Sequence, residues 1–135
     1  MKIGIIGGGA SGLVTAIKSK TNNNEVTILE RNSSCGKKIL VTGNGRCNYW
    51  NNNQEIEKII NKETEEEVLD FFNELGIVPK IKNGYWYPST NQAMTIKEAL
   101  VDECISKGII IRTNYLVEKI EIKKDKFIIN NELEF

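Results

Sequence analysis

Residues 2–12 read "KIGIIGGGASG", and this stretch decides the fold. Its first half is apolar and rich in β-branched residues, which predicts a buried strand over residues 2–6. Residues 11–20 then carry apolar side chains at helical spacing, and "EVTILE", residues 25–30, predicts a second strand. Strand, glycine turn, helix and strand within about thirty residues form a βαβ unit. We therefore predict a parallel sheet with a right-handed crossover.

Three glycines of this turn, Gly7, Gly9 and Gly12, follow the GxGxxG pattern. The first allows a tight turn, the second lets a pyrophosphate approach the backbone, and the third lets the helix pack closely. Glu30 ends the second strand, where a carboxylate can accept hydrogen bonds from both hydroxyls of a ribose. Because a carboxylate disfavours a 2′-phosphate, NADP fits least, and FAD and NAD both remain open. The alternative is a glycine turn without a nucleotide.

The rest of the chain predicts a long functional loop, two more helices and a β-meander. Residues 31–53 lack periodicity except around "KILV", which predicts one helical turn. Both helices carry a capping box and a glycine stop. The predicted boundaries are Thr64 to Gly76 and Thr95 to Gly108 for the helices, 109–113 for a buried parallel strand, 116–122 and 126–129 for alternating strands, and "ELEF" for a further extended segment.

Composition narrows the classes of function. Lys plus Arg and Asp plus Glu both number 18, so no net field attracts nucleic acid or an anionic membrane. The absence of histidine removes a catalytic triad, and the three cysteines lack the pairing of a zinc site or a disulfide framework. No apolar run approaches the ~18 residues of a membrane span. We expect one domain over residues 1–135, in the cytoplasm, without metal.

The motifs "GGGASGL", "VTILERN", "GKKILVTGNGRCN", "YPSTNQA" and "GIIIRTNYLVEKI" occur in this order. The chain thereby resembles the bacterial flavoproteins of the aminoacetone-oxidase family of FAD-binding enzymes, which belong to the glutathione-reductase-type FAD/NAD(P)-binding superfamily. The resemblance implies a three-layer, Rossmann-like α/β domain with a parallel sheet, helices and a C-terminal β-meander. Members of that family continue well beyond this point, so the chain is expected to be an incomplete, N-terminal fragment whose retention of FAD is open.

The resemblance also implies a set of cofactor-binding residues. In the loop "TGNGRCN", Arg46 is expected near the pyrophosphate or the pyrimidine edge of a flavin, unless it bonds loop carbonyls instead. Cys47 is expected to pack in the loop in preference to a redox role. The implied set is Gly7, Gly9, Ala10, Ser11 and Gly12 at the pyrophosphate, Glu30 at the adenosine ribose, Arg31, Lys37 and Lys38 close to the nucleotide, Thr42, Gly43, Asn44, Gly45 and Arg46 in the loop, and Val117 pairing with adenine through its backbone.

These observations favour the FAD-binding portion of an FAD-dependent oxidoreductase that acts on a small amine or another reduced metabolite. The sequence identifies no catalytic residue. One alternative is a cofactor-free, inactive fragment that self-associates through an open sheet edge, forming a homo-oligomer. A second alternative is an NAD-binding Rossmann enzyme, in which further βα units would follow residue 113 in place of the meander.

Overall fold

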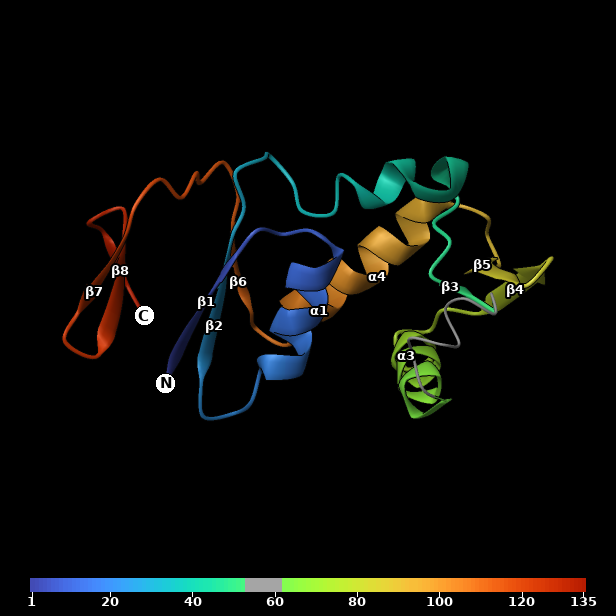
Figure 1. Ribbon diagram of the computed structural model, residues 1–135, viewed down its shortest axis with the longest axis horizontal. Helices are drawn as coiled ribbons and strands as arrows, with labels where there is room; N and C mark the ends of the chain where they lie inside the picture. Colours follow the sequence, from blue (N-terminus) through green and yellow to red (C-terminus); the bar gives the residue numbers. More distant parts are fainter. Residues whose placement is uncertain (53–61) are drawn as a thin grey trace. The chain divides into compact units, whose positions relative to one another are not determined.

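A computed structural model describes residues 1–52 and 62–135 of the protein. Its contacts divide the chain into two compact units, each of which is described by itself. The first unit comprises Met1–Lys37 and Val101–Phe135, and the second unit comprises Lys38–Leu100. Figure 1 shows the elements in chain order. The expectation of a single domain stays a prediction.

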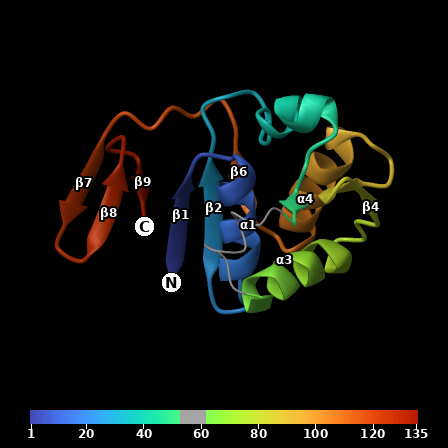
Figure 2. The same cartoon turned by 45° about the vertical axis from the view of Figure 1, so that its right-hand side comes forward.

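The first unit is built on a parallel three-stranded sheet. Its strands are β1 (Lys2–Ile6), β2 (Glu25–Leu29) and β6 (Ile110–Arg112), with β2 in the middle. Helix α1 (Ala10–Ser19) connects β1 to β2 and packs against both of them (Figure 2). The predicted βαβ unit is thus confirmed, with its helix starting one residue earlier than expected.

The core of the first unit lies between α1 and β2. Leu13 and Ala16 of the helix and Val26 and Ile28 of the strand are all fully buried. Strand β2 is buried on both faces, as the central strand of a parallel sheet must be, and it accordingly reads as a continuous apolar run. The prediction that residues 109–113 form a buried strand is wrong for Ile110, which is 43% exposed. Among the described strands β6 pairs with β2 alone, so it lies at the edge of the sheet.

The predicted meander is confirmed as an antiparallel sheet of β7 (Ile120–Lys123), β8 (Lys126–Ile129) and β9 (Leu133–Glu134). Its first strand begins four residues later than the alternating pattern predicts. Asn130 explains the difference, because its Oδ1 accepts hydrogen bonds from the backbone N–H groups of Glu118 and Lys119 at 2.9 and 3.1 Å. Those residues therefore bond to a side chain instead of extending the strand.

The second unit contains a 3₁₀ segment, a small antiparallel sheet and helices. The order in the sheet is β3–β5–β4, and Asn83 and Gly84 form the turn between β4 and β5 with φ of 53° and 78°. Left-handed conformations at both positions are typical of the tightest hairpins, and β4 and β5 pair antiparallel on either side of this turn. The elements are η1 (Ile39–Gly45), β3 (Trp50–Asn51), α3 (Lys62–Glu74), β4 (Pro79–Lys82), β5 (Tyr85–Pro88) and α4 (Ala93–Ser106), whose last residues belong to the first unit.

The predicted ends of α3 and α4 are confirmed, but their predicted starts are wrong. At Gly76, φ is 76°, and the next residue, Ile77, donates its N–H to the carbonyl of Phe72 at 3.0 Å, as in a Schellman motif. Gly108 ends α4 in the same way. Thr64 and Thr95, predicted as N-caps, both lie two residues inside their helices.

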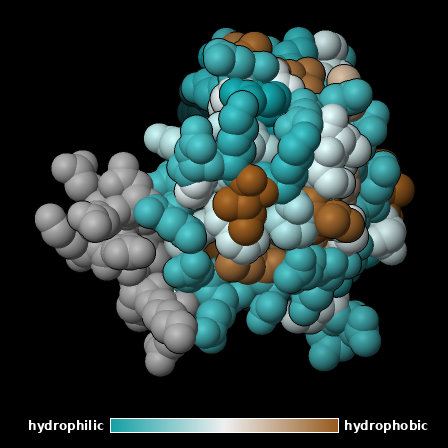
Figure 3. Space-filling view, turned by 90° about the vertical axis from the view of Figure 1, so that its right-hand side faces the viewer, coloured by the Kyte–Doolittle hydropathy of each residue, from teal (hydrophilic) through white to brown (hydrophobic). Residues whose placement is uncertain are grey.

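Hydrophilic residues cover most of the face seen in Figure 3, and hydrophobic residues form separate patches among them. Together, the parallel sheet, the helix on it and the antiparallel strands make the protein a Rossmann-like α/β domain. The turn between β1 and α1 lies at the carboxyl end of β1, the end at which such sheets bind their ligands.

Candidate functional site

The glycine turn of the first unit has the geometry that the GxGxxG pattern requires. Gly7 has φ of 97°, a value that suits glycine, and its N–H donates to the carbonyl of Leu29 at 2.8 Å. A Cβ added to Gly12 would meet the carbonyl oxygen of Gly7 well inside 3.0 Å, the limit that real Cβ atoms observe. Only glycine fits at this position without a shift of the backbone.

The start of α1 has no side-chain cap. Gly9 is the N-cap residue and makes no side-chain cap hydrogen bond, so the N–H groups of Ala10 and Ser11 have no side-chain partner there. A Cβ on Gly9 would meet no atom within 4 Å, which leaves the approach to these donors open. An uncapped helix N-terminus with an open approach is suited to a phosphate.

Glu30 lies beside this turn with its side chain buried, at 6% exposure. Its Oε2 accepts the N–H of Gly8 at 2.7 Å. Its Oε1 accepts the backbone N–H and the Nδ2 of Asn32, at 2.7 and 2.6 Å. Burial alone raises the pKa of Glu30, but the hydrogen bonds from Asn32 and Gly8, with the nearby charge of Arg31, outweigh it and leave the pKa lowered. The carboxylate is therefore anionic at neutral pH.

The middle glycine of the triplet has a structural role that the sequence pattern does not assign. A Cβ on Gly8 would clash with the Sγ of Cys35, which is 4% exposed, and the N–H of Gly36 donates to the carbonyl of Gly8 at 2.7 Å. The loop after β2 thus packs directly on the glycine turn.

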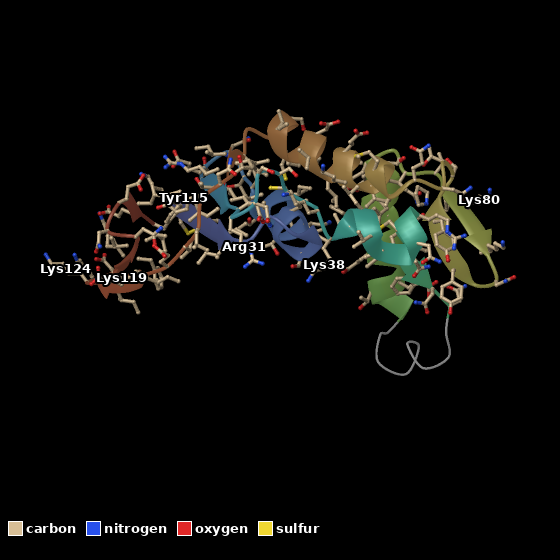
Figure 4. All side chains as sticks on the ribbon, turned by 90° about the horizontal axis from the view of Figure 1, so that it is seen from above. Arg31, Lys38, Lys80, Tyr115, Lys119 and Lys124 are labelled. Atoms are coloured by element: carbon tan, nitrogen blue, oxygen red, sulfur yellow. The ribbon has the colours of Figure 1, made fainter. Side chains whose placement is uncertain are left out.

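The structure brings Gly7, Gly9, Ala10, Ser11, Gly12 and Glu30 together in the first unit. Arg31 follows Glu30, and its exposed side chain extends away from the ribbon in Figure 4. Val117 lies in the same unit, in a segment held by Asn130, whose Nδ2 donates to the carbonyl of Leu116 at 2.7 Å. That all of these residues contact a cofactor stays a prediction.

The remaining predicted residues lie elsewhere. Lys37 is the last residue of the first unit's opening segment, and Lys38 begins the second unit; both are exposed. Thr42, Gly43, Asn44, Gly45 and Arg46 all belong to the second unit. Their place in a common site with the glycine turn stays a prediction.

The loop "TGNGRCN", residues 42–48, bends sharply on itself. Left-handed φ values occur at Gly43, Asn44 and Gly45 (54°, 53° and 77°). The guanidinium of Arg46 lies 4.6 Å from the ring centroid of Tyr87, and its Nε donates to the carbonyl of Gly43 at 3.2 Å. Arg46 therefore bonds a loop carbonyl, as in the alternative interpretation of its role.

Cys47 is buried in the same loop, with φ of 56°. Burial raises the pKa of its thiol, and a hydrogen bond with the side chain of Thr42 offsets only part of this effect. A protonated, buried thiol is a poor nucleophile. This environment favours the packing role over the redox role.

The described residues, 1–52 and 62–135, contain neither a cluster of potential metal ligands nor a helix suited to span a membrane. Within these ranges, no group of three or more His, Cys, Asp or Glu side chains is placed to hold a metal ion. No helix in the described part of the chain is long and apolar enough to cross a membrane.

Comparisons with known proteins agree with this geometry. A 3-dehydro-bile acid delta(4,6)-reductase from Clostridium scindens is 38% identical, over 95% of this chain and 34% of that protein. A ribosomal RNA dihydrouridine synthase from Escherichia coli is 26% identical, over 90% of this chain and 33% of that protein. The chain thus spans about a third of the length of these curated relatives.

The solved structure of THI4 from Thermovibrio ammonificans matches with a TM-score of 0.65 and 19% identity, over 96% of this chain and 47% of that one. At that identity the likeness supports the fold alone. The model of the HI0933-like protein Rossmann domain matches residues 1–134, nearly the whole length. The chain therefore belongs to the HI0933-like Rossmann-domain family.

Proposed function

We propose that this chain is the FAD-binding portion of an FAD-dependent oxidoreductase. The observation that carries the proposal is the pairing, in the first unit, of an uncapped α1 N-terminus with the buried carboxylate of Glu30 across the glycine turn. Backbone N–H groups suit a pyrophosphate, and a carboxylate suits the hydroxyls of an adenosine ribose. The open space at Gly9 and the constraint at Gly12 fit the same ligand.

Bound FAD would supply the redox chemistry, so the protein needs no side-chain base for that step. A chain of 135 residues without histidine is compatible with such a role. The work of these residues would be to bind and orient: α1 would hold the pyrophosphate, Glu30 the ribose, and the backbone of Val117 the adenine. FAD is favoured over NAD because the β7–β9 meander follows β6 where further βα units would be expected in an NAD domain.

The activity of the whole protein is proposed from its relatives. Because the chain spans about a third of their length, residues that choose a substrate would lie largely outside it. We propose an oxidoreductase of the aminoacetone-oxidase type acting on a small organic metabolite. The 38% identity to a bile acid reductase supports a reductive reaction as readily as an oxidative one.

The experiment is a spectrum of the purified chain followed by titration with FAD, FMN and NADH. FMN lacks the adenosine half that the glycine turn and Glu30 would hold, so it is expected to bind at least about tenfold more weakly than FAD. Glu30→Gln should weaken FAD binding, whereas Glu25→Gln, an exposed carboxylate at the other end of β2, should not. Tighter binding of NADH than of FAD would favour the NAD alternative, and equal binding of FAD and FMN would refute the proposal.

A second candidate, the cofactor-free and self-associating fragment, is favoured by the open edges of the sheet. Among the described strands, β1 pairs only with β2, and β1 borders an apolar groove of about 390 Å³ shared with the meander. The groove includes Ile3, Phe127 and Phe135. Unpaired edges beside apolar surface promote association. This candidate would be supported by a colourless protein whose melting temperature does not change when FAD is added. The molecular mass of its assembly in solution should also rise with protein concentration.

A further inference from the structure

The carboxylate of Glu30 has little hydrogen-bonding capacity left. A carboxylate offers about four acceptor positions, two on each oxygen. In the structure Oε1 accepts two donors, both from Asn32, and Oε2 accepts one, the N–H of Gly8. The remaining position is therefore on Oε2, the oxygen that faces the glycine turn.

Asn32 is itself fixed in place. Its carbonyl accepts the N–H of Asn114 at 2.9 Å, and the carbonyl of Glu30 accepts the N–H of Tyr115 at 2.9 Å. These two bonds tie the segment after β2 to the segment after β6. The side chain of Asn32 donates to the Glu30 carboxylate through its Nδ2, and its backbone N–H donates to the same oxygen.

We propose that Asn32 is a positioning residue: it holds Oε1 of Glu30, so that Oε2 alone remains to accept one ribose hydroxyl of an adenine nucleotide. The ribose part of this inference rests on the proposed function. The sequence alone suggested that Glu30 receives both hydroxyls of the ribose. The structure instead leaves a single acceptor position, and Asn32 is the residue that takes up the others.

The electrostatics agree with this role. Hydrogen bonds from the backbone and the side chain of Asn32 are two of the causes that lower the pKa of Glu30, and the charge of Arg31 adds to them. An anionic acceptor makes a stronger hydrogen bond with a hydroxyl than a neutral one does. Removing the amide donor would therefore change both the orientation and the proton affinity of Glu30.

The first test needs no ligand. Asn32→Asp is nearly isosteric and keeps the backbone N–H, but it replaces the donating amide by a second carboxylate. In ¹³C NMR titrations of the Glu30 carboxyl, Asn32→Asp and Asn32→Ala should both raise the pKa. The exposed Asn22, replaced by alanine, is the matched control and should leave it unchanged. If the pKa of Glu30 in both Asn32 variants equals that of the wild type, the inference is overturned.

The second test measures binding of ADP, 2′-deoxy-ADP and 3′-deoxy-ADP by calorimetry. With one acceptor position, the wild type should lose about tenfold in affinity for only one of the two deoxy analogues. Asn32→Asp should reduce that discrimination to about twofold or less, with Asn22→Ala behaving like the wild type. Equal losses for both analogues, or discrimination that survives in Asn32→Asp, would overturn the inference even if FAD binds. If the wild type binds none of the three, the proposed function fails, and the carboxyl titration alone decides the role of Asn32.

Discussion

Gly12→Ala should unfold the first unit at a lower temperature, whereas Gly9→Ala should not. The two glycines belong to the same turn, but their surroundings differ. A Cβ on Gly12 would point at the carbonyl of Gly7, and a Cβ on Gly9 would meet no atom within 4 Å. The pair therefore separates the packing requirement at Gly12 from the proposed approach of a ligand at Gly9.

The expected magnitude follows from the contact at Gly12. Overpacking costs about 1–3 kcal/mol, and we take the upper value because the obstacle is a backbone carbonyl that must move by roughly 1 Å. The turn resists this movement, since the N–H of Gly7 is bonded to Leu29 at 2.8 Å. The higher helix propensity of alanine offsets about 1 kcal/mol of this cost. The net loss of about 2 kcal/mol lowers the melting temperature by roughly 6–10 °C in a chain of this size.

At Gly9 two small effects oppose each other. Alanine is a poorer N-cap than glycine by roughly 0.5 kcal/mol. It also lowers the conformational entropy of the unfolded chain, which stabilises the folded state by a similar amount. The melting temperature should therefore stay within about 2 °C of the wild type. The added methyl lies where a pyrophosphate would approach α1, so FAD affinity should fall at least about tenfold.

Thermal melts followed by circular dichroism, and FAD titration of each variant, provide the assay. Equal melting temperatures for Gly12→Ala and the wild type would refute the packing argument. Unchanged FAD affinity in Gly9→Ala would show that the space at Gly9 is not where the cofactor binds.

Substitutions at three positions test other parts of the structure. Because the pKa of Glu30 is lowered in the folded state, its carboxylate stabilises the fold at neutral pH. This stabilisation is lost as the pH falls through the lowered pKa. The wild type should therefore exceed Glu30→Gln in free energy of unfolding at neutral pH, and urea unfolding should show this difference shrinking towards about pH 3. Gly76→Ala should cost about 1 kcal/mol in the same measurement, because φ at this helix end is 76°; an equally stable variant would contradict the Schellman assignment. Arg46→Ala should cost about 1 kcal/mol through its loss of the Tyr87 contact, with Arg46→Lys intermediate; equal stability of all three proteins would show that the stacking contributes nothing.

Features set by short-range rules were predictable from the sequence. The glycine turn and the stops at Gly76 and Gly108 each depend on backbone freedom at one or two positions. Helix starts were harder, because several residues near Thr95 can begin a helix. In the structure the N–H of Thr95 donates to the carbonyl of Gln92, so α4 is already under way there.

Features that depend on distant neighbours were not predictable. Whether the side chains of a strand such as β6 are buried depends on what packs against its faces, and the apolar composition of residues 109–113 carries no information on that point. The number of hydrogen bonds that the Glu30 carboxylate can still accept also depends on distant neighbours. A fingerprint locates the carboxylate at the end of β2, but the number of acceptor positions that remain depends on which donors surround it.

The contacts of Gly8 extend this reasoning to the fingerprint itself. In GxGxxG the second position is free, yet here it meets Cys35 from the loop after β2, and a bond from Gly36 to the carbonyl of Gly8 holds that loop in place. The N–H of Gly8 meanwhile donates to Glu30. Gly8 therefore connects the turn, the acidic residue and the loop, three features that the sequence pattern treats separately. The pattern predicts the glycines of the turn, but it does not predict this connection, because Gly8 occupies a position that the pattern leaves free.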